Sequence, residues 1–109
     1  MNPKKRRNNA DSAIIQTVAV DLKDLLQLPE TPESIDKEGL AKAISPMVSQ
    51  LLNREFERFL QLCYRLDLGE GKVRERLNQC PPEEITHQMS LAIVDRQLIK
   101  VHFRQKYKE

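Results

Sequence analysis

Residue types that commonly perform catalysis or bind metals are sparse in this sequence of 109 residues. His87 and His102 belong to no HExxH or similar zinc-ligand pattern. Glu84 and His87 form one Glu-x-x-His string, but a helical di-metal site needs two such strings together with further inward-facing glutamates. We therefore expect neither histidine to bind a metal, and we expect the chain to have no cofactor.

Nucleophilic catalysis has no better support in the sequence. Cys63 and Cys80 form no CxxC pair, and Cys63 falls in an apolar helical pattern that is typical of a small core residue. Neither Cys63 nor any serine has a nearby histidine that the sequence identifies as its general base. The three glycines form no phosphate-binding loop. The sequence therefore predicts that the protein is not an enzyme.

Cationic side chains are concentrated at the two ends of the chain. Residues 1–9 carry four basic and no acidic residues, and residues 96–109 carry five basic and one acidic, although the net charge is only +2. Positive ends of this kind can contact nucleic-acid phosphates, but cations at a helix C-terminus are also favoured by the helix dipole. Nucleic-acid binding is therefore the alternative function, with eight candidate contacts: Lys4, Lys5, Arg6, Arg7, Lys100, Arg104, Lys106 and Lys108.

Hydrophobic periodicity predicts helices throughout the chain, and no segment alternates as a strand would. Three long segments and two short ones carry apolar residues at helical spacing: 13–28, 34–44, 45–66, 72–79 and 82–107. Leucine, isoleucine and valine must form most of the core because tryptophan is absent and aromatic residues make up 5% of the chain. We therefore predict an all-α bundle of three principal helices plus one or two short helices.

Capping signals set the expected boundaries of these helices. Asp11 or Ser12 is expected to cap the first helix, and Ser45-Pro46 resembles the start of another, because proline is favoured at the first helical position. Gly69 and Gly71 are expected to end that second helix, since glycine adopts the left-handed conformation that follows many helices.

The chain has the length of one domain. We predict a disordered basic tail over residues 1–10 and a single helical domain over residues 11–109. No apolar run is long enough to span a membrane, and no apolar stretch follows the N-terminal charges as it would in a secretory signal. We therefore expect a cytoplasmic protein with no membrane contact.

The last predicted helix is apolar on two opposite sides. Successive residues lie 100° apart on a helix, which separates its apolar residues into two stripes. One stripe contains Ile85, Met89, Ala92, Ile99 and Phe103, and the other contains Leu91, Val94, Leu98 and Val101.

Two apolar sides require two packing partners. One possibility is a central helix enclosed by the two other long helices. The other is a helix that completes the core with one stripe and meets a second subunit with the stripe that contains Leu91, Val94, Leu98 and Val101. On the second interpretation the protein is a non-catalytic helical interaction module, and its partner is a second copy or another helical protein.

Two charged residues interrupt the apolar stripes. Glu55 lies among Leu51 and Phe59, and Arg96 lies on the stripe of Ile99. An unpaired buried charge is too costly to retain, so each side chain must have a partner or reach water. We predict that Glu55 and Arg96 form a structural ion pair, with the alternative that both pack their stems and expose their charged groups.

Two short strings resemble segments of small bacterial proteins. Tyr64-Arg65-Leu66-Asp67 precedes a Gly-Glu turn, and Asp95-Arg96-Gln97-Leu98 lies in the last helix. In these strings the chain is similar to short all-helical bacterial proteins of uncharacterised function, over about residues 50–105. The resemblance implies a bacterial cytoplasmic source, and it implies no activity.

Overall fold

Five α-helices form the part of the chain that the structure, a computed structural model, describes. That part comprises the backbone of residues 3–34 and 36–107 and the side chains of residues 13–34 and 36–107. The helices are α1 (Pro3–Leu26), α2 (Lys37–Arg54), α3 (Phe56–Arg65), α4 (Glu70–Gln79) and α5 (Pro82–Lys106). No strand occurs in these residues, which confirms the predicted all-α class.

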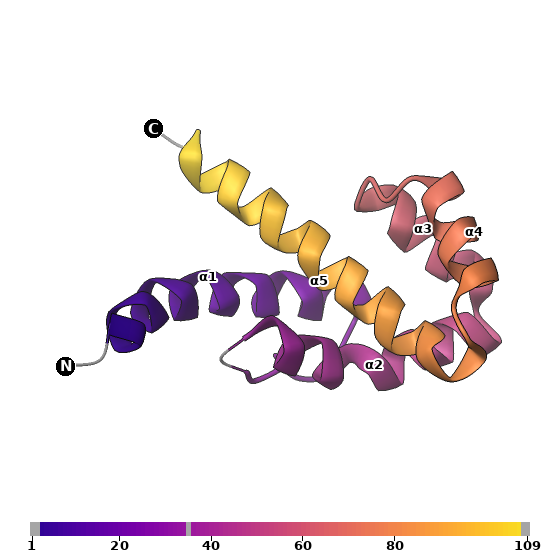
Figure 1. The fold of residues 1–109 in the computed structure, drawn as a ribbon, viewed down its shortest axis with the longest axis horizontal. Coiled ribbons are helices and arrows are strands. Elements are labelled where there is room, and N and C mark those ends of the chain that lie inside the picture. The colour runs from indigo at the N-terminus through magenta and orange to yellow at the C-terminus, as the bar shows by residue number, and fades with distance from the viewer. Residues whose placement is uncertain (1–2, 35, 108–109) are drawn as a thin grey trace.

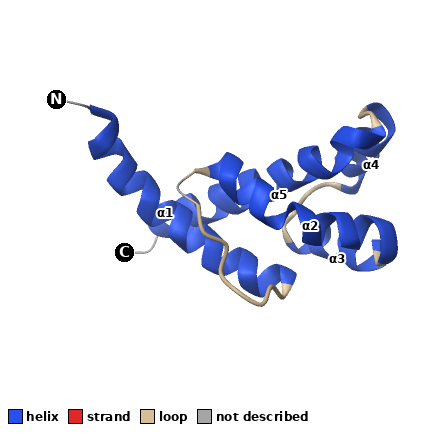
Figure 2. Cartoon of the chain, turned by 90° about the horizontal axis from the view of Figure 1, so that it is seen from below, coloured by secondary structure: helices blue, strands red, loops and turns tan. Residues whose placement is uncertain are grey.

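Helix α5 lies at the centre of the fold. It crosses α1 and packs along α2, while α3 and α4 lie beside its N-terminal part, at the end of the molecule opposite the two chain termini (Figures 1 and 2). The core at these crossings includes Leu22 of α1, Ile44 of α2, Phe59 of α3 and Ile93 of α5, all with 0% of their surface exposed.

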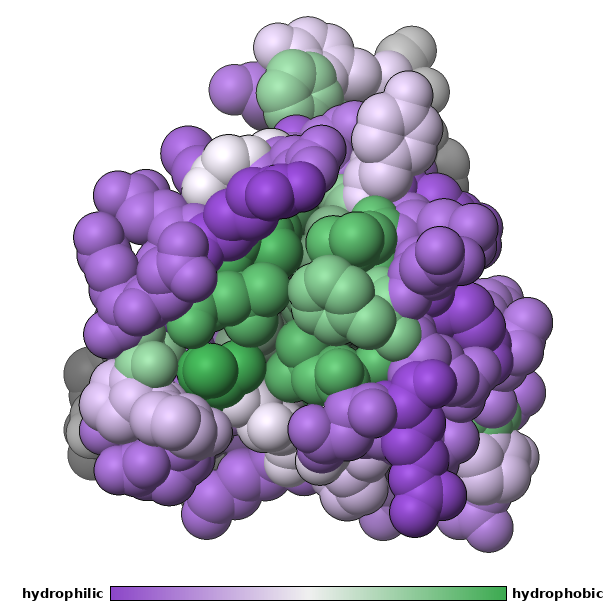
Figure 3. All heavy atoms as spheres, turned by 90° about the vertical axis from the view of Figure 1, so that its right-hand side faces the viewer, coloured by the Kyte–Doolittle hydropathy of each residue, from purple (hydrophilic) through white to green (hydrophobic). Residues whose placement is uncertain are grey.

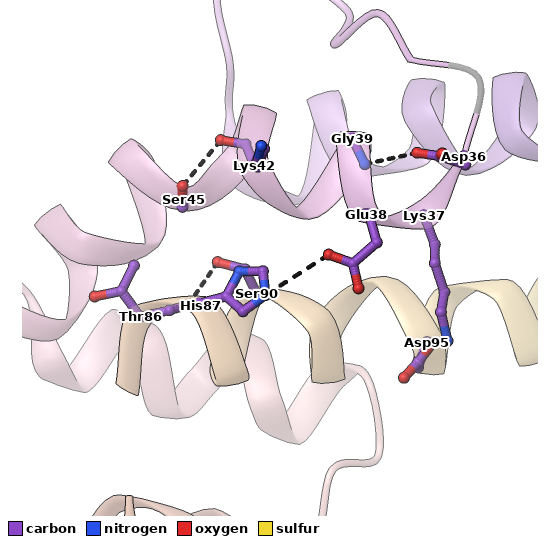
Figure 4. Close-up of polar contacts among 10 residues, drawn as sticks. All are labelled: Asp36, Lys37, Glu38, Gly39, Lys42, Ser45, Thr86, His87, Ser90 and Asp95. Carbon is purple, nitrogen blue, oxygen red and sulfur yellow. Dashed lines mark hydrogen bonds and ion pairs between the residues drawn. The ribbon is translucent and has the colours of Figure 1, made fainter. Parts of the chain in front are cut away.

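Helix α2 begins before the predicted start at Ser45-Pro46 and includes both residues. Its N-cap is Asp36, whose carboxylate accepts a hydrogen bond of 2.8 Å from the Gly39 backbone N–H. Pro46 has no N–H to donate to the Lys42 carbonyl four residues earlier, but the Ser45 hydroxyl donates to that oxygen at 2.9 Å (Figure 4). The replaced hydrogen bond explains why this proline lies inside a helix, and the predicted start is wrong.

The predicted helix over residues 45–66 is divided at Glu55. This residue has φ −137° and ψ 56°, so it ends α2 and precedes α3. The turn after α3 also differs from the prediction, because Asp67, not Gly69, takes the left-handed conformation, with φ 61°. Its neighbour Leu68 donates a backbone hydrogen bond of 2.8 Å to the Cys63 carbonyl, which is the pattern of a Schellman helix end.

Helix α1 extends further toward the N-terminus than predicted. Its backbone is helical from Pro3, so the expected start at Asp11 or Ser12 is wrong. The N-terminal turns project beyond the other helices (Figure 2). The side chains of residues 1–12 lie outside the described set, and the disordered tail predicted over residues 1–10 stays a prediction.

Candidate interaction surfaces

Half of the stripe predicted as an interface belongs to the core. Val94 and Val101 are fully buried, and Leu91 and Leu98 are half-buried against the core cluster. This side of α5 is covered because α1 and α2 pack along the helix. The structure therefore corrects the prediction, since Val94 and Val101 cannot meet a second subunit without unfolding.

A polar cluster fixes α1 against α5. The Asp21 carboxylate accepts 2.8 Å hydrogen bonds from the buried Gln97 amide and from the Arg104 guanidinium. Gln97 is only 5% exposed, so its amide depends on this partner for a hydrogen bond. The cluster is a structural contact, and it also engages one of the cations that the sequence assigned to nucleic-acid binding.

A second set of polar contacts joins the N-terminal part of α2 to α5 (Figure 4). Lys37 Nζ lies 2.9 Å from Asp95 Oδ1, and His87 Nε2 lies 3.7 Å from Glu38 Oε1. The hydrogen bond and charge of Asp95 raise the pKa of Lys37 above its ordinary value. These exposed pairs orient the two helices and leave the apolar contacts between them to provide most of the stability.

The predicted ion pair between Glu55 and Arg96 is wrong. Glu55 lies at the junction of α2 and α3, where its carboxylate accepts hydrogen bonds from Arg58, one turn later, and from Gln50 at 3.2 Å. These hydrogen bonds lower the pKa of Glu55. Arg58 and Gln50 lie close to Glu55 in the sequence, and their hydrogen bonds satisfy its carboxylate without Arg96.

Arg96 has a different role from the one predicted. Its Nε donates a hydrogen bond of 2.9 Å to the Leu66 carbonyl, and its Nη2 lies 3.9 Å from Asp67 Oδ2. The last carbonyl groups of a helix lack partners within the helix. The guanidinium on the apolar stripe of α5 therefore caps the C-terminal end of α3.

The opposite stripe of α5 is the one that remains partly uncovered. Met89 and Ala92 are buried, but Ile99, Phe103 and Tyr107 are 51%, 60% and 67% exposed. The rings of Phe103 and Tyr107 contact each other with centroids 4.8 Å apart. We call Ile99, Phe103 and Tyr107 the α5 stripe. The sequence periodicity located Ile99 and Phe103 but did not include Tyr107, and it did not show that this end of the stripe lacks a cover.

A second apolar surface lies between α3 and α4, at the end of the molecule seen in Figure 3, where apolar side chains gather in a hollow with a polar border. The groove between these helices has a volume of about 520 Å³. Its apolar lining residues come from both helices and their connection, and we call it the α3–α4 groove: Leu60, Cys63, Leu68 and Val73, with Tyr64 at the edge.

Neighbouring side chains extend the α3–α4 groove along both helices. Phe56 lies one turn before Leu60 on the same face of α3 and is 41% exposed. Leu77 lies one turn after Val73 on α4 and is half-buried. Sequence reasoning missed this groove. The available signal was the breadth of the apolar face over residues 48–66, which exceeds what one packing partner covers.

The two cysteines are both free, and they differ in burial. Burial raises the pKa of Cys63 to about 11, so its thiol is protonated at neutral pH and a poor nucleophile. Cys80 lies at the end of α4 and forms no disulfide bond with Cys63. Within the described residues, no three histidine, cysteine or acidic side chains are grouped as a metal site would require.

The cations proposed to bind nucleic acid divide into three groups. Lys100 lies 3.2 Å from Asp67, and Arg104 lies 2.8 Å from Asp21, so both are already ion-paired. Lys106 is exposed at the end of α5. The remaining side chains lie outside the described set: Lys4, Lys5, Arg6, Arg7 and Lys108.

Comparisons with protein-family models, curated proteins and solved structures gave no match. None of the helices in the described residues combines the length and the hydropathy of a membrane span.

Proposed function

We propose that the protein is a non-catalytic helical interaction module that forms a homodimer through the α3–α4 groove. The observation that supports this proposal is the hollow of apolar side chains bordered by polar ones at the end of the molecule formed by α3 and α4 (Figure 3). Contiguous exposed apolar surface on a small chain is characteristic of a protein contact. The groove takes the place of the α5 contact that the sequence predicted.

The charges at the border of the α3–α4 groove suit a second copy of the chain. Glu70 and Arg74 form an ion pair of 2.7 Å on the exposed side of α4, and Arg65 and Gln61 lie on the opposite wall. A two-fold dimer places the same patch on both sides of the interface, so the patch must complement itself. A border with both signs of charge meets this condition, whereas residues 96–107 around the α5 stripe contain cations and no acidic residue.

Tyr64 is the expected anchor of this interface. Its side chain is 83% exposed beside Leu60, about twice the exposed fraction of Phe56 on the same helix. Tyrosine supplies a large contact area at a low entropic cost and is enriched among residues that dominate binding energy. Burial of this ring by the second copy is therefore a specific consequence of the proposal.

Size-exclusion chromatography with light scattering tests the proposal. We expect the mass of a dimer for the wild-type protein and the mass of a monomer for Tyr64→Glu, which introduces a charge at an exposed position and leaves the core intact. Leu60→Ser is a second variant in the groove, and Val20→Glu is the matched control, because Val20 is 49% exposed on α1, away from the groove.

Circular dichroism verifies that each variant remains folded. A wild-type protein that stays monomeric over the accessible concentration range would refute the proposal. A dimer whose mass is unchanged by both groove variants would refute it equally.

A further inference from the structure

The α5 stripe continues into a second groove, between α4 and α5. This α4–α5 groove has a volume of about 640 Å³, and Ile99 belongs both to it and to the stripe. Its apolar floor contains Leu68, Val73, Met89 and Ala92. Ile99, Phe103 and Tyr107 lie within about 80° of one another around the helix. Arg96 lies between Ala92 and Ile99 on this side, but its guanidinium turns toward the Leu66 carbonyl and Asp67, so the stripe and the floor adjoin and form one largely apolar track along α5.

The length of this track matches a short helix. It runs from Ala92 to Tyr107, which at 1.5 Å per residue corresponds to about 22 Å, or four helical turns. One half lies in the groove beside α4, and the other half is an open helix face that ends in the contacting rings of Phe103 and Tyr107. A groove that continues into an elongated helix face favours a partner helix over a flat bilayer surface.

The border of the track is positively charged. Lys72 and Arg76 lie on the α4 side of the groove and form no ion pair within the described residues. Residues 96–107 contain several cations and no acidic residue.

The two carboxylates at this border are already neutralised by other residues. Asp67 pairs with Lys100 at 3.2 Å, and Asp95 pairs with Lys37 at 2.9 Å. The excess positive charge therefore remains at the border, where it complements an anionic partner and repels a second copy of the same stripe.

From the apolar track and its positive border we propose that the track binds an acidic amphipathic helix of a partner protein. The partner helix places apolar residues at i, i+4 and i+8 against the floor and the α5 stripe, and its glutamates or aspartates face Lys72, Arg76 and Lys106. A nucleic acid fits the track less well, because its phosphates would contact the cations of the border and leave the apolar floor and the α5 stripe uncovered. The proposal does not require dimerisation: the two grooves share Leu68 and Val73, but Lys72, Arg76 and Ile99 line the α4–α5 groove alone.

Fluorescence polarisation with a synthetic probe tests this inference. The probe is a fluorescein-labelled helical peptide of about 16 residues, roughly the length of the track, with leucines at i, i+4 and i+8 and glutamates on its other faces. The control peptide keeps the leucines and replaces every glutamate by lysine. We expect the acidic peptide to bind, to weaken as salt is raised because exposed charges are screened, and to exceed the lysine peptide in affinity by about tenfold or more.

Protein variants then locate the binding surface. Phe103→Ser removes an exposed anchor, and the double variant Lys72→Glu with Arg76→Glu reverses the border charge; each is expected to weaken binding by about tenfold or more. Lys42→Glu is the matched charge control, since Lys42 is exposed on α2 and outside the groove. Tyr64→Glu is expected to bind the peptide as the wild type does, so that a failure of dimerisation and a failure of this inference are distinguishable.

Several results would overturn the inference. Equal affinity for the two peptides would do so, as would acidic-peptide binding that is unchanged in both track variants. Tighter binding of a single-stranded DNA oligonucleotide or of phosphatidylglycerol vesicles, lost in Phe103→Ser, would assign the track to a nucleic acid or a membrane instead.

Discussion

A pair of substitutions on α5 separates its core stripe from its exposed one. Val101 has 0% of its surface exposed, whereas Ile99, two residues earlier on the same helix, is 51% exposed. Val101→Ala removes two buried methyl groups, which costs about 1.6 kcal/mol in transfer free energy at about 0.8 kcal/mol per group. The residual cavity raises the expected loss of unfolding free energy to about 2–3 kcal/mol. Ile99→Ala removes atoms that already contact water and is expected to cost less than about 1 kcal/mol.

Urea unfolding followed by circular dichroism measures both losses, with all proteins at one concentration because dimer formation is linked to stability. With a denaturant slope of about 1–3 kcal/mol/M for a small protein, Val101→Ala is expected to lower the urea midpoint by about 1–2 M. The reasoning fails if Val101→Ala shifts the midpoint no more than Ile99→Ala does.

Three further perturbations test individual contacts. Asp21→Ala is expected to cost about 1–3 kcal/mol in urea unfolding because it leaves the buried Gln97 amide without an acceptor, and Asp21→Asn is expected to cost less; equal costs would show that the amide does not depend on this hydrogen bond. At pH 8, iodoacetamide is expected to modify Cys80 and spare Cys63, whose burial raises its pKa to about 11. Peptide mass spectrometry measures the modification of each cysteine, and faster modification of Cys63 would contradict its burial. The lowered pKa of Glu55 stabilises the fold above the ordinary glutamate pKa of about 4.3, and this contribution is lost as the pH falls through the lower folded value. Thermal unfolding of Glu55→Gln should therefore show a deficit at pH 7 that closes in acid, and a deficit independent of pH would contradict the assignment.

The helical class of the protein follows from its sequence, because apolar residues at a period near 3.6 determine helices by local geometry. The two-sided character of α5 was also visible in the spacing of its apolar residues. Which stripe is exposed was not visible, because this depends on where other helices cross. Helices α1 and α2 cover Val94 and Val101, whereas α4 covers only the N-terminal part of the stripe that ends at Phe103.

The errors in the boundaries have local physical causes. Ser45-Pro46 is typical of a helix start in sequence. In the structure the Ser45 hydroxyl satisfies the Lys42 carbonyl, which allows Pro46 to lie inside a helix. Glu55 carries no breaking signal in its residue type, so the junction of α2 and α3 is imposed by tertiary packing. Asp67 takes the left-handed position although glycine follows two residues later, because its predecessor Leu66 is buried and fixes the end of α3.

The α3–α4 groove could not be derived from the sequence for a related reason. Its two walls come from helices that the sequence presents separately, and the relative placement of α3 and α4 determines whether their apolar residues cover each other. The resulting groove leaves Phe56 and Tyr64 exposed. A broad apolar face is readable in the sequence, but its uncovered part is a property of the assembled fold.

Nuclear Overhauser spectroscopy on a mixture of isotope-labelled and unlabelled protein tests the central claim most directly, because it detects only contacts between copies. We expect intermolecular contacts from Tyr64 to the methyl groups of Leu60, Leu68 and Leu77 in the α3–α4 groove. An absence of intermolecular contacts at high concentration, or contacts confined to Ile99 and Phe103 on α5, would contradict the proposed dimer.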